Sequence, residues 1–314
     1  MGTVLVLWLT VSFAVAYRLT HRPRPRFEER APRVAWGTLE DHRIKTRDGE
    51  ELGAWFLKGD DDLPIVLLLH GNKGSRWNSL TRAEIFASQG WGVLMISLRA
   101  HGDSSGDFHD VGLSARRDVV AAVEFLEARR PGRPIVVMGT SLGAATAVFA
   151  AEELGQRVKG YILESPYKDL KTAVWNRTDT YLPPALSHAG YLGLRAVGPL
   201  FLPNLDEISP LKAIGGIPND VPVLISRKTG RARQIEASKG TSTSSATQRK
   251  ETKNRPCCYP KDARSEPGRF LLLLNNVNRY FPCIFAFRSV LTRCKSRFRI
   301  PLSPFELVRP RRLW

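Results

Sequence analysis

Cysteine is absent from the first 256 residues of the 314-residue chain. The four cysteines are Cys257, Cys258, Cys283 and Cys294. None of them has the two-residue spacing typical of zinc and redox motifs, so the pattern predicts no metal site. The absence also excludes a disulfide framework from most of the chain and leaves the redox compartment open.

Acidic residues are scarce after residue 226. Residues 227–314 contain 21 Lys or Arg against 5 Asp or Glu, a net charge of +16, whereas residues 1–226 have a net charge of +1. The formal charge of +17 therefore belongs to the last part of the chain, and no nucleic-acid partner is expected. Residues 227–250 are polar, basic and of low complexity, which predicts a disordered basic tail over 227–314.

Charged side chains are also absent from the first 17 residues, MGTVLVLWLTVSFAVAY. A membrane-spanning helix needs about 20 apolar residues, with about 17 as the lower limit. We expect residues 1–17 to be an uncleaved membrane anchor, because a secretory signal begins with a positive region that is missing here. Ala14-Val15-Ala16 resembles a cleavage site, so secretion after signal cleavage is the alternative. The Pro/Arg-rich linker 18–35 carries clustered arginines, which favour a main domain facing the cytoplasm.

Strand and helix patterns alternate from residue 36 to residue 226. An antiparallel pair of strands is predicted around the turn signal Asp48-Gly49. Buried strands are predicted at 65–69, 91–98, 135–138, 160–163 and 221–225, and helices at 114–128 and 142–154. We therefore expect an α/β fold, a mostly parallel twisted sheet with helices on both faces. The aromatic, Pro-punctuated segment of about 168–219 is too long for a loop and predicts a helical cap.

One junction between a strand and a helix carries a catalytic motif. Strand 135–138 runs into Gly139-Thr140-Ser141-Leu142-Gly143, which has the pattern G-x-S-x-G. Such a turn lifts the serine hydroxyl above the sheet, and Gly139 and Gly143 must be small because side chains there would collide with the adjacent strand and helix. Ser141 is therefore the candidate nucleophile. A plain tight turn is the alternative, which a second motif upstream disfavours.

The second motif, His70-Gly71-Asn72-Lys73-Gly74, directly follows the predicted strand 65–69. Acyl transfer builds negative charge on the carbonyl oxygen of the substrate, and each backbone NH aimed at that oxygen stabilises it by about 3–4 kcal/mol. We expect the NH groups of Asn72 and Leu142 to form this oxyanion hole. His70 is expected to be a structural residue that forms hydrogen bonds within the loop.

Together these motifs resemble those of the α/β-hydrolases, in the branch of the serine aminopeptidases and monoglyceride lipases. Residues 98–106 resemble the R-G-x-G-x-S turn after the fourth strand, with Ala100 where glycine is common, and residues 164–167 resemble the stretch after the sixth strand. The resemblance implies an α/β-hydrolase domain over 36–226. It also implies an ester, thioester or amide substrate that is a small molecule or lipid-like, an acyl-serine intermediate, and no metal or cofactor.

The acid and histidine that the resemblance implies are missing from their expected positions. The acid is due shortly after strand 221–225, where residues 226–231 read SRKTGR, and no histidine follows His188. We therefore expect the last strand and helix to be missing and the chain to be inactive or nearly so, since loss of triad members can cost about a million-fold in turnover. His188 lies in the predicted cap, which lacks a rigid orienting acid, so it is disfavoured as a substitute base.

Two explanations of residues 227–314 stay open. A broken reading frame or splice pattern near Ser226, the favoured one, explains why fold pattern, charge and cysteine content all change there, and it implies an intact serine hydrolase as the parent protein. A genuine basic tail would instead bind an anionic surface with a strong salt dependence. This second explanation fits a non-catalytic binding protein on a hydrolase scaffold.

Overall fold

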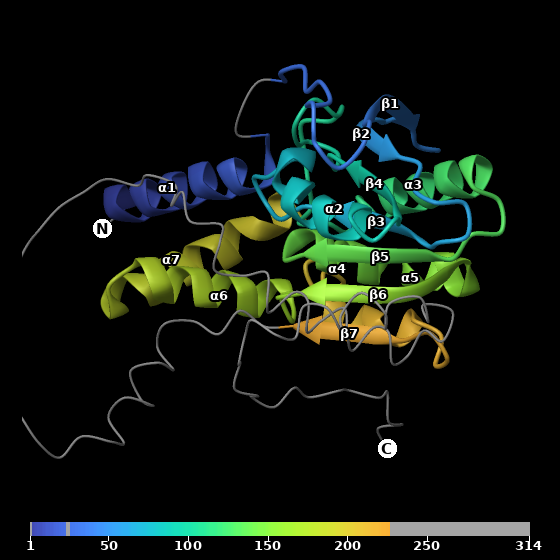
Figure 1. The fold of residues 1–314 in the computed structure, drawn as a ribbon. Coiled ribbons are helices and arrows are strands. Elements are labelled where there is room, and N and C mark those ends of the chain that lie inside the picture. The colour runs from blue at the N-terminus through green and yellow to red at the C-terminus, as the bar shows by residue number, and fades with distance from the viewer. Residues whose placement is uncertain (1, 23–25, 227–314) are drawn as a thin grey trace, which may run out of the picture. The chain divides into compact units, whose positions relative to one another are not determined.

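A seven-stranded sheet forms the centre of the structure, a computed structural model that describes residues 2–22 and 26–226 (Figure 1). The predicted disordered tail, 227–314, lies outside the described residues. The strands are β1 (Glu40–Lys45), β2 (Glu51–Leu57), β3 (Ile65–Leu69), β4 (Gly92–Ile96), β5 (Ile135–Thr140), β6 (Val158–Glu164) and β7 (Val223–Ser226), in the spatial order β1-β2-β4-β3-β5-β6-β7. β1 pairs antiparallel with β2, and β2 with β4, while all later neighbours are parallel. The mostly parallel sheet predicted from the sequence is confirmed.

The central strands are covered on both faces, as their composition predicts. β3 reads IVLLL and β4 reads GVLMI, and every residue of both is buried. Continuous aliphatic runs of this kind fit parallel strands between two layers of helices. β1, at one edge of the sheet, reads EDHRIK and is exposed along most of its length.

Helices connect the parallel strands and continue beyond them. Their bounds are α1 (Gly2–Thr20), α2 (Leu80–Ala87), α3 (Arg116–Arg129), α4 (Leu142–Phe149), α5 (Ala151–Leu154), α6 (Leu170–Tyr181), α7 (Pro184–Val197) and α8 (Pro210–Ala213). Short 3-10 turns cover Arg76–Ser79, Gly155–Arg157, Gly198–Leu200 and Ile214–Gly216. α4 is buried along its whole length, in keeping with its apolar, alanine-rich sequence. α1 is long and apolar enough to cross a membrane by length and composition.

Of the helices between β6 and β7, α6 and α7 lie past the carboxyl ends of the parallel strands, with α1 beside α7 (Figure 1). A second hydrophobic cluster connects them to the sheet. It consists of Ala145 and Phe149 of α4 packed with Leu170, Leu202 and Ile208. The apolar residues of the predicted cap segment therefore pack on the helix that follows Ser141.

Where it is described, the segment predicted as a linker, 18–35, is built into the fold. α1 continues to Thr20, three residues past the predicted end of the apolar segment. Arg22 follows, and its side chain is only 8% exposed. The guanidinium donates hydrogen bonds of 2.5–3.1 Å to the carbonyl oxygens of Gly102, Ser104 and Gly106. Composition alone does not distinguish this buried arginine from the solvated arginines expected beside a membrane.

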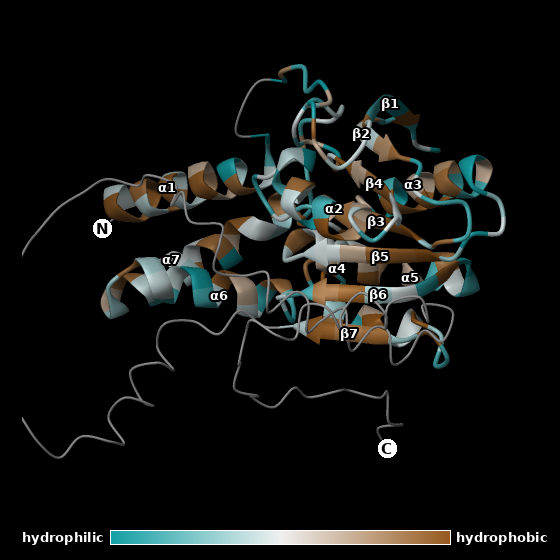
Figure 2. Ribbon diagram, in the orientation of Figure 1, coloured by the Kyte–Doolittle hydropathy of each residue, from teal (hydrophilic) through white to brown (hydrophobic). Residues whose placement is uncertain are grey.

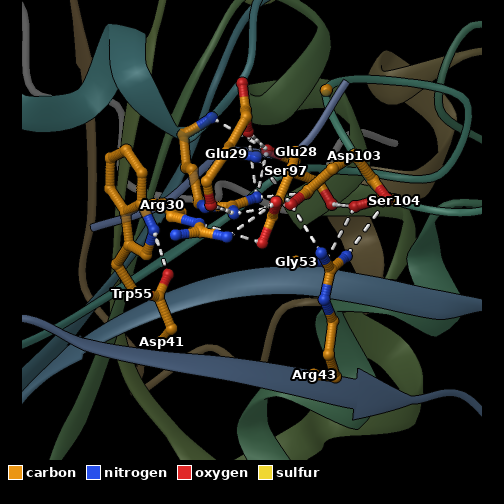
Figure 3. Close-up of polar contacts among 12 residues, drawn as sticks. Glu28, Glu29, Arg30, Asp41, Arg43, Gly53, Trp55, Ser97, Asp103 and Ser104 are labelled. Carbon is orange, nitrogen blue, oxygen red and sulfur yellow. Dashed lines mark hydrogen bonds and ion pairs between the residues drawn. The ribbon is translucent and has the colours of Figure 1, made fainter. Parts of the chain in front are cut away.

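A buried ion network fixes the same segment to the first turn after β3 (Figure 3). Arg76 is 1% exposed, and its Nη1 lies 2.5 Å from Asp103 Oδ1 and 2.9 Å from Glu29 Oε2. The hydroxyl of Ser97 donates to the same Glu29 oxygen at 2.9 Å. Burial raises the pKa of Asp103, but the hydrogen bonds and charge of Arg76 outweigh it and keep that pKa below its usual value. Both carboxylates therefore share one buried guanidinium.

Replacing Arg76 by methionine should lower the free energy of unfolding by about 3–5 kcal/mol, because two buried carboxylates lose the buried guanidinium that they share. Arg43→Met is the matched control: Arg43 also binds Asp103, at 2.7 Å, but its side chain is 41% exposed. Its loss should cost less than about 1 kcal/mol. Denaturant unfolding of the full chain measures both, and equal costs would contradict this assignment.

Candidate functional site

Ser141 stands at the sharp turn between β5 and α4, with φ 51° and ψ −105°. A non-glycine residue with positive φ carries backbone strain of about 1–3 kcal/mol, and such strain is typical of a nucleophile elbow. The Ser141 NH donates to the carbonyl oxygen of Glu164 on β6 at 2.8 Å, which holds the turn against the neighbouring strand. Ser141 is exposed, so its hydroxyl is accessible.

The two glycines of the motif are required by close backbone contacts. A Cβ on Gly143 would lie 2.6 Å from the carbonyl oxygens of Leu69 and His70, at the end of β3. A Cβ on Gly139 would lie 2.4 Å from the Gly143 carbonyl. Real Cβ atoms do not approach other atoms this closely, so the first turn of α4 can only reach β5 and β3 if both residues are glycine.

The loop after β3 reaches the same turn. A Cβ on Gly71 would lie 3.8 Å from the Ser141 Cβ and 3.4 Å from the Thr140 carbonyl oxygen. Among the described residues, neither the NH of Asn72 nor that of Leu142 has a hydrogen-bond partner. Two donors without internal partners, one in the loop and one at the start of a helix, suit a site that receives a negatively charged oxygen.

His70 is a buried structural residue of this loop. The NH of Leu98 donates to its Nε2 at 3.0 Å, so the proton is on Nδ1, which donates to the Gly71 carbonyl oxygen at 2.8 Å. Burial, aided by the neighbouring His101, lowers the pKa of His70 to about 3. A neutral ring with both nitrogens engaged joins the loop to the end of β4 and has no nitrogen left to accept the Ser141 proton.

Glu164, at the end of β6, forms a polar link that the sequence analysis did not assign. Its Oε2 accepts a hydrogen bond from the Thr140 hydroxyl at 2.9 Å and lies 2.5 Å from Arg82 Nη2 of α2. The carboxylate therefore ties the residue before Ser141 to a helix that follows the Gly71 loop. The sequence feature that could have indicated this link is a charged residue at the carboxyl end of a buried strand.

The turn at 98–106 is held by a second buried arginine. Arg99 Nε lies 2.8 Å from Asp118 Oδ1 and its Nη1 lies 2.7 Å from Asp48 Oδ2. Burial raises the pKa of Asp118 to about 6 in spite of the Arg99 charge. Ala100 has φ 59°, the left-handed conformation that glycine adopts freely.

The structure shows no contact between Ser141 and His188, the other histidine considered from the sequence. His188 is exposed on α7, where its Nδ1 lies 3.1 Å from the Pro184 carbonyl oxygen and its ring packs edge-on against Trp175 at 4.8 Å. β7 ends at Ser226, so the segment expected to carry the acid lies outside the described residues. Within residues 2–22 and 26–226, no group of three or more His, Cys, Asp or Glu side chains is placed to hold a metal ion.

Comparisons with known proteins identify relatives among serine hydrolases and esterases. Residues 61–213 match the family model described as serine aminopeptidase, S33. The rat lysophosphatidylserine lipase ABHD12 is 32% identical over 146 residues, 43% of this chain and 35% of that protein. The Saccharomyces cerevisiae membrane protein YNL320W is 29% identical over 130 residues, 41% of this chain and 46% of that protein. The chain thus spans less than half the length of either relative. Among solved structures, the Pyrococcus furiosus esterase Pf2001 is 27% identical with a TM-score of 0.50, covering 64% of this chain and 75% of that one.

Gly143→Ala should destabilise the protein by about 1–3 kcal/mol, because the new methyl group would push α4 away from the end of β3. Gly215→Ala is the control, since a Cβ there meets nothing within 4 Å. Thermal unfolding of the two variants compares them directly. A Gly143→Ala protein as stable as the control would show that α4 does not approach β3 this closely.

Proposed function

Because the chain belongs to the α/β-hydrolase superfamily, we propose that it is a serine hydrolase in which Ser141 attacks the carbonyl carbon of an ester, thioester or amide. The observation that carries this proposal is the exposed, strained Ser141 beside two backbone NH groups that have no partner among the described residues. The same arrangement has no evident use in a purely structural turn.

In the proposed reaction the Ser141 oxygen bonds to the carbonyl carbon, and the carbonyl oxygen becomes an anion. The NH groups of Asn72 and Leu142 stabilise that anion. Collapse of the intermediate breaks the bond to the leaving group, which takes up the proton that Ser141 lost and departs as the alcohol, thiol or amine. Water then cleaves the acyl-serine, giving the carboxylic acid and restoring the Ser141 hydroxyl. The protein's contribution at these steps is the fixed position of the hydroxyl and of the two donors.

The chain as it stands should turn over slowly. The proton of Ser141 needs an acceptor. In α/β-hydrolases that acceptor is a histidine that follows the acid in the chain. No histidine follows His188, and no aspartate lies between Asp220 and Asp262. Without the histidine and the acid, substrate binding and the oxyanion hole alone accelerate hydrolysis roughly 10³–10⁴-fold over the reaction in water.

We further propose a lipid-like acyl substrate and a membrane location. α1 supplies an apolar helix of membrane-spanning length, and one relative is named a lysophosphatidylserine lipase. In this proposal α1 anchors the hydrolase domain, 36–226, on the cytoplasmic side; secretion after signal cleavage is the alternative. The boundaries of the cap, about 168–219, are part of the same proposal.

A binding protein on a hydrolase scaffold is the second candidate, favoured by the missing acid and histidine. It would bind an acyl ligand equally well with or without the Ser141 hydroxyl. Its basic residues 227–314 would add an affinity for anionic surfaces that falls steeply with salt.

Incubation with a fluorophosphonate probe tests the nucleophile. We expect slow labelling that mass spectrometry places on Ser141, and its loss in Ser141→Ala. Ser88→Ala, which removes another exposed serine hydroxyl, should label like the unmodified chain. His188→Ala should also label normally, because that ring packs on α7 against Trp175. An unmodified Ser141 after prolonged exposure to excess probe would favour the binding protein.

A further inference from the structure

We propose that the corner between α6 and α7, residues 181–186, enters the lipid bilayer beside α1, so that the cap and the N-terminal helix contact the membrane as one surface. This inference rests on the proposed anchoring by α1. It goes further by assigning a second membrane contact, made by a segment about 180 residues away in the sequence.

α1 and α7 lie side by side and run in the same direction. The indole Nε1 of Trp8 donates to the Ala189 carbonyl oxygen at 3.1 Å. One turn further on, a Cβ at Gly193 would lie 2.1 Å from the Ser12 hydroxyl, so the two backbones approach closely there. Beyond the end of α7, Phe201 also contacts α1, with its ring 4.9 Å from the ring of Phe13.

Only a narrow face of α1 is covered by this contact. Its buried residues are Ser12, Ala16 and Thr20, spaced four apart along one side. The large apolar side chains point elsewhere, and their exposed fractions are 71% for Val4, 54% for Leu5, 63% for Val6, 65% for Leu7 and 54% for Val11. Figure 2 shows this hydrophobic character along α1. Most of the apolar surface of α1 is not covered by other described residues, so it is free to contact lipid.

The register of the helix pair places the corner at the same depth as the start of α1. Trp8 is opposite Ala189, and a helix pair in that register has Val4 near Ala185. The corner is apolar and uncovered there, with exposed fractions of 70% for Tyr181, 38% for Leu182 and 57% for Leu186. Residues 180–194 contain no Asp, Glu, Lys or Arg. A bilayer that receives the first turns of α1 therefore also meets this corner, with little cost from buried charge.

Charged residues limit how deep the corner goes. Arg177 and Asp179, on the last turn of α6, are exposed, and the Arg177 guanidinium lies 5.8 Å from the centre of the Tyr181 ring. Tyrosine and arginine together are typical of the interface between water and hydrocarbon. Arg195, exposed near the end of α7, marks the other boundary. The corner thus inserts by a few turns and does not cross the membrane.

Site-specific fluorescence in phosphatidylcholine vesicles tests this. The four cysteines are replaced by serine, and an environment-sensitive fluorophore is attached to the full chain at Leu186→Cys, Val6→Cys or Asp62→Cys. Asp62 precedes β3, and its side chain is 98% exposed. We expect a blue shift, and quenching by lipid-borne quenchers, at positions 186 and 6 but not at position 62.

The possible failures are distinguishable. A label at position 6 that stays in water would remove the membrane anchor and this inference with it. A label at position 6 in lipid with the label at 186 in water would overturn this inference alone. A blue shift at 186 in lipid-free dimers, detected by light scattering, would assign the corner to a second copy of the chain and would also overturn it. Labelling of Ser141 by the fluorophosphonate probe is independent of all three.

Discussion

The contact between the first turn of α4 and the end of β3 is the constraint on which the candidate site depends. At Gly143 the helix backbone meets the carbonyl oxygens of Leu69 and His70 at a distance that no side chain would permit. This approach brings the NH groups at the start of α4 next to the loop that follows β3. It also forces the chain at Ser141 into its positive φ, because β5 must turn into α4 within one residue.

Buried polar networks hold the pieces around that contact. Glu164 links the residue before Ser141 to α2, and Arg76 fixes the turn after the Gly71 loop to Glu29 and Asp103. Networks of this kind are costly to disrupt, because each buried charge depends on its partners. The strain at the elbow persists because the surrounding structure determines its position from several sides.

The sheet and the Ser141 turn could be predicted because their signals are local. β3 has the predicted bounds, 65–69, since a run of five aliphatic residues leaves little choice of structure. The burial of Arg22 and Glu29 could not be predicted, because it depends on partners about 70–80 residues away, and the Pro/Arg-rich composition around them resembles that of a solvated linker. The packing of α1 on α7 could not be predicted for the same reason, because the sequence of an apolar helix does not show which small residues of a distant segment it will contact.

The position of Arg22 links the end of α1 to the loop after β3 through two sets of buried contacts. The Arg22 guanidinium, two residues after the end of α1, donates hydrogen bonds to the backbone of the 102–106 turn, and Asp103 in that turn binds Arg76, the second residue after Gly74. Each connection is short and buried, so tension on the helix passes through few flexible bonds. In the proposed anchoring by α1, bilayer thickness, which sets the tilt of an apolar helix, has a route through these contacts to the loop beside Ser141.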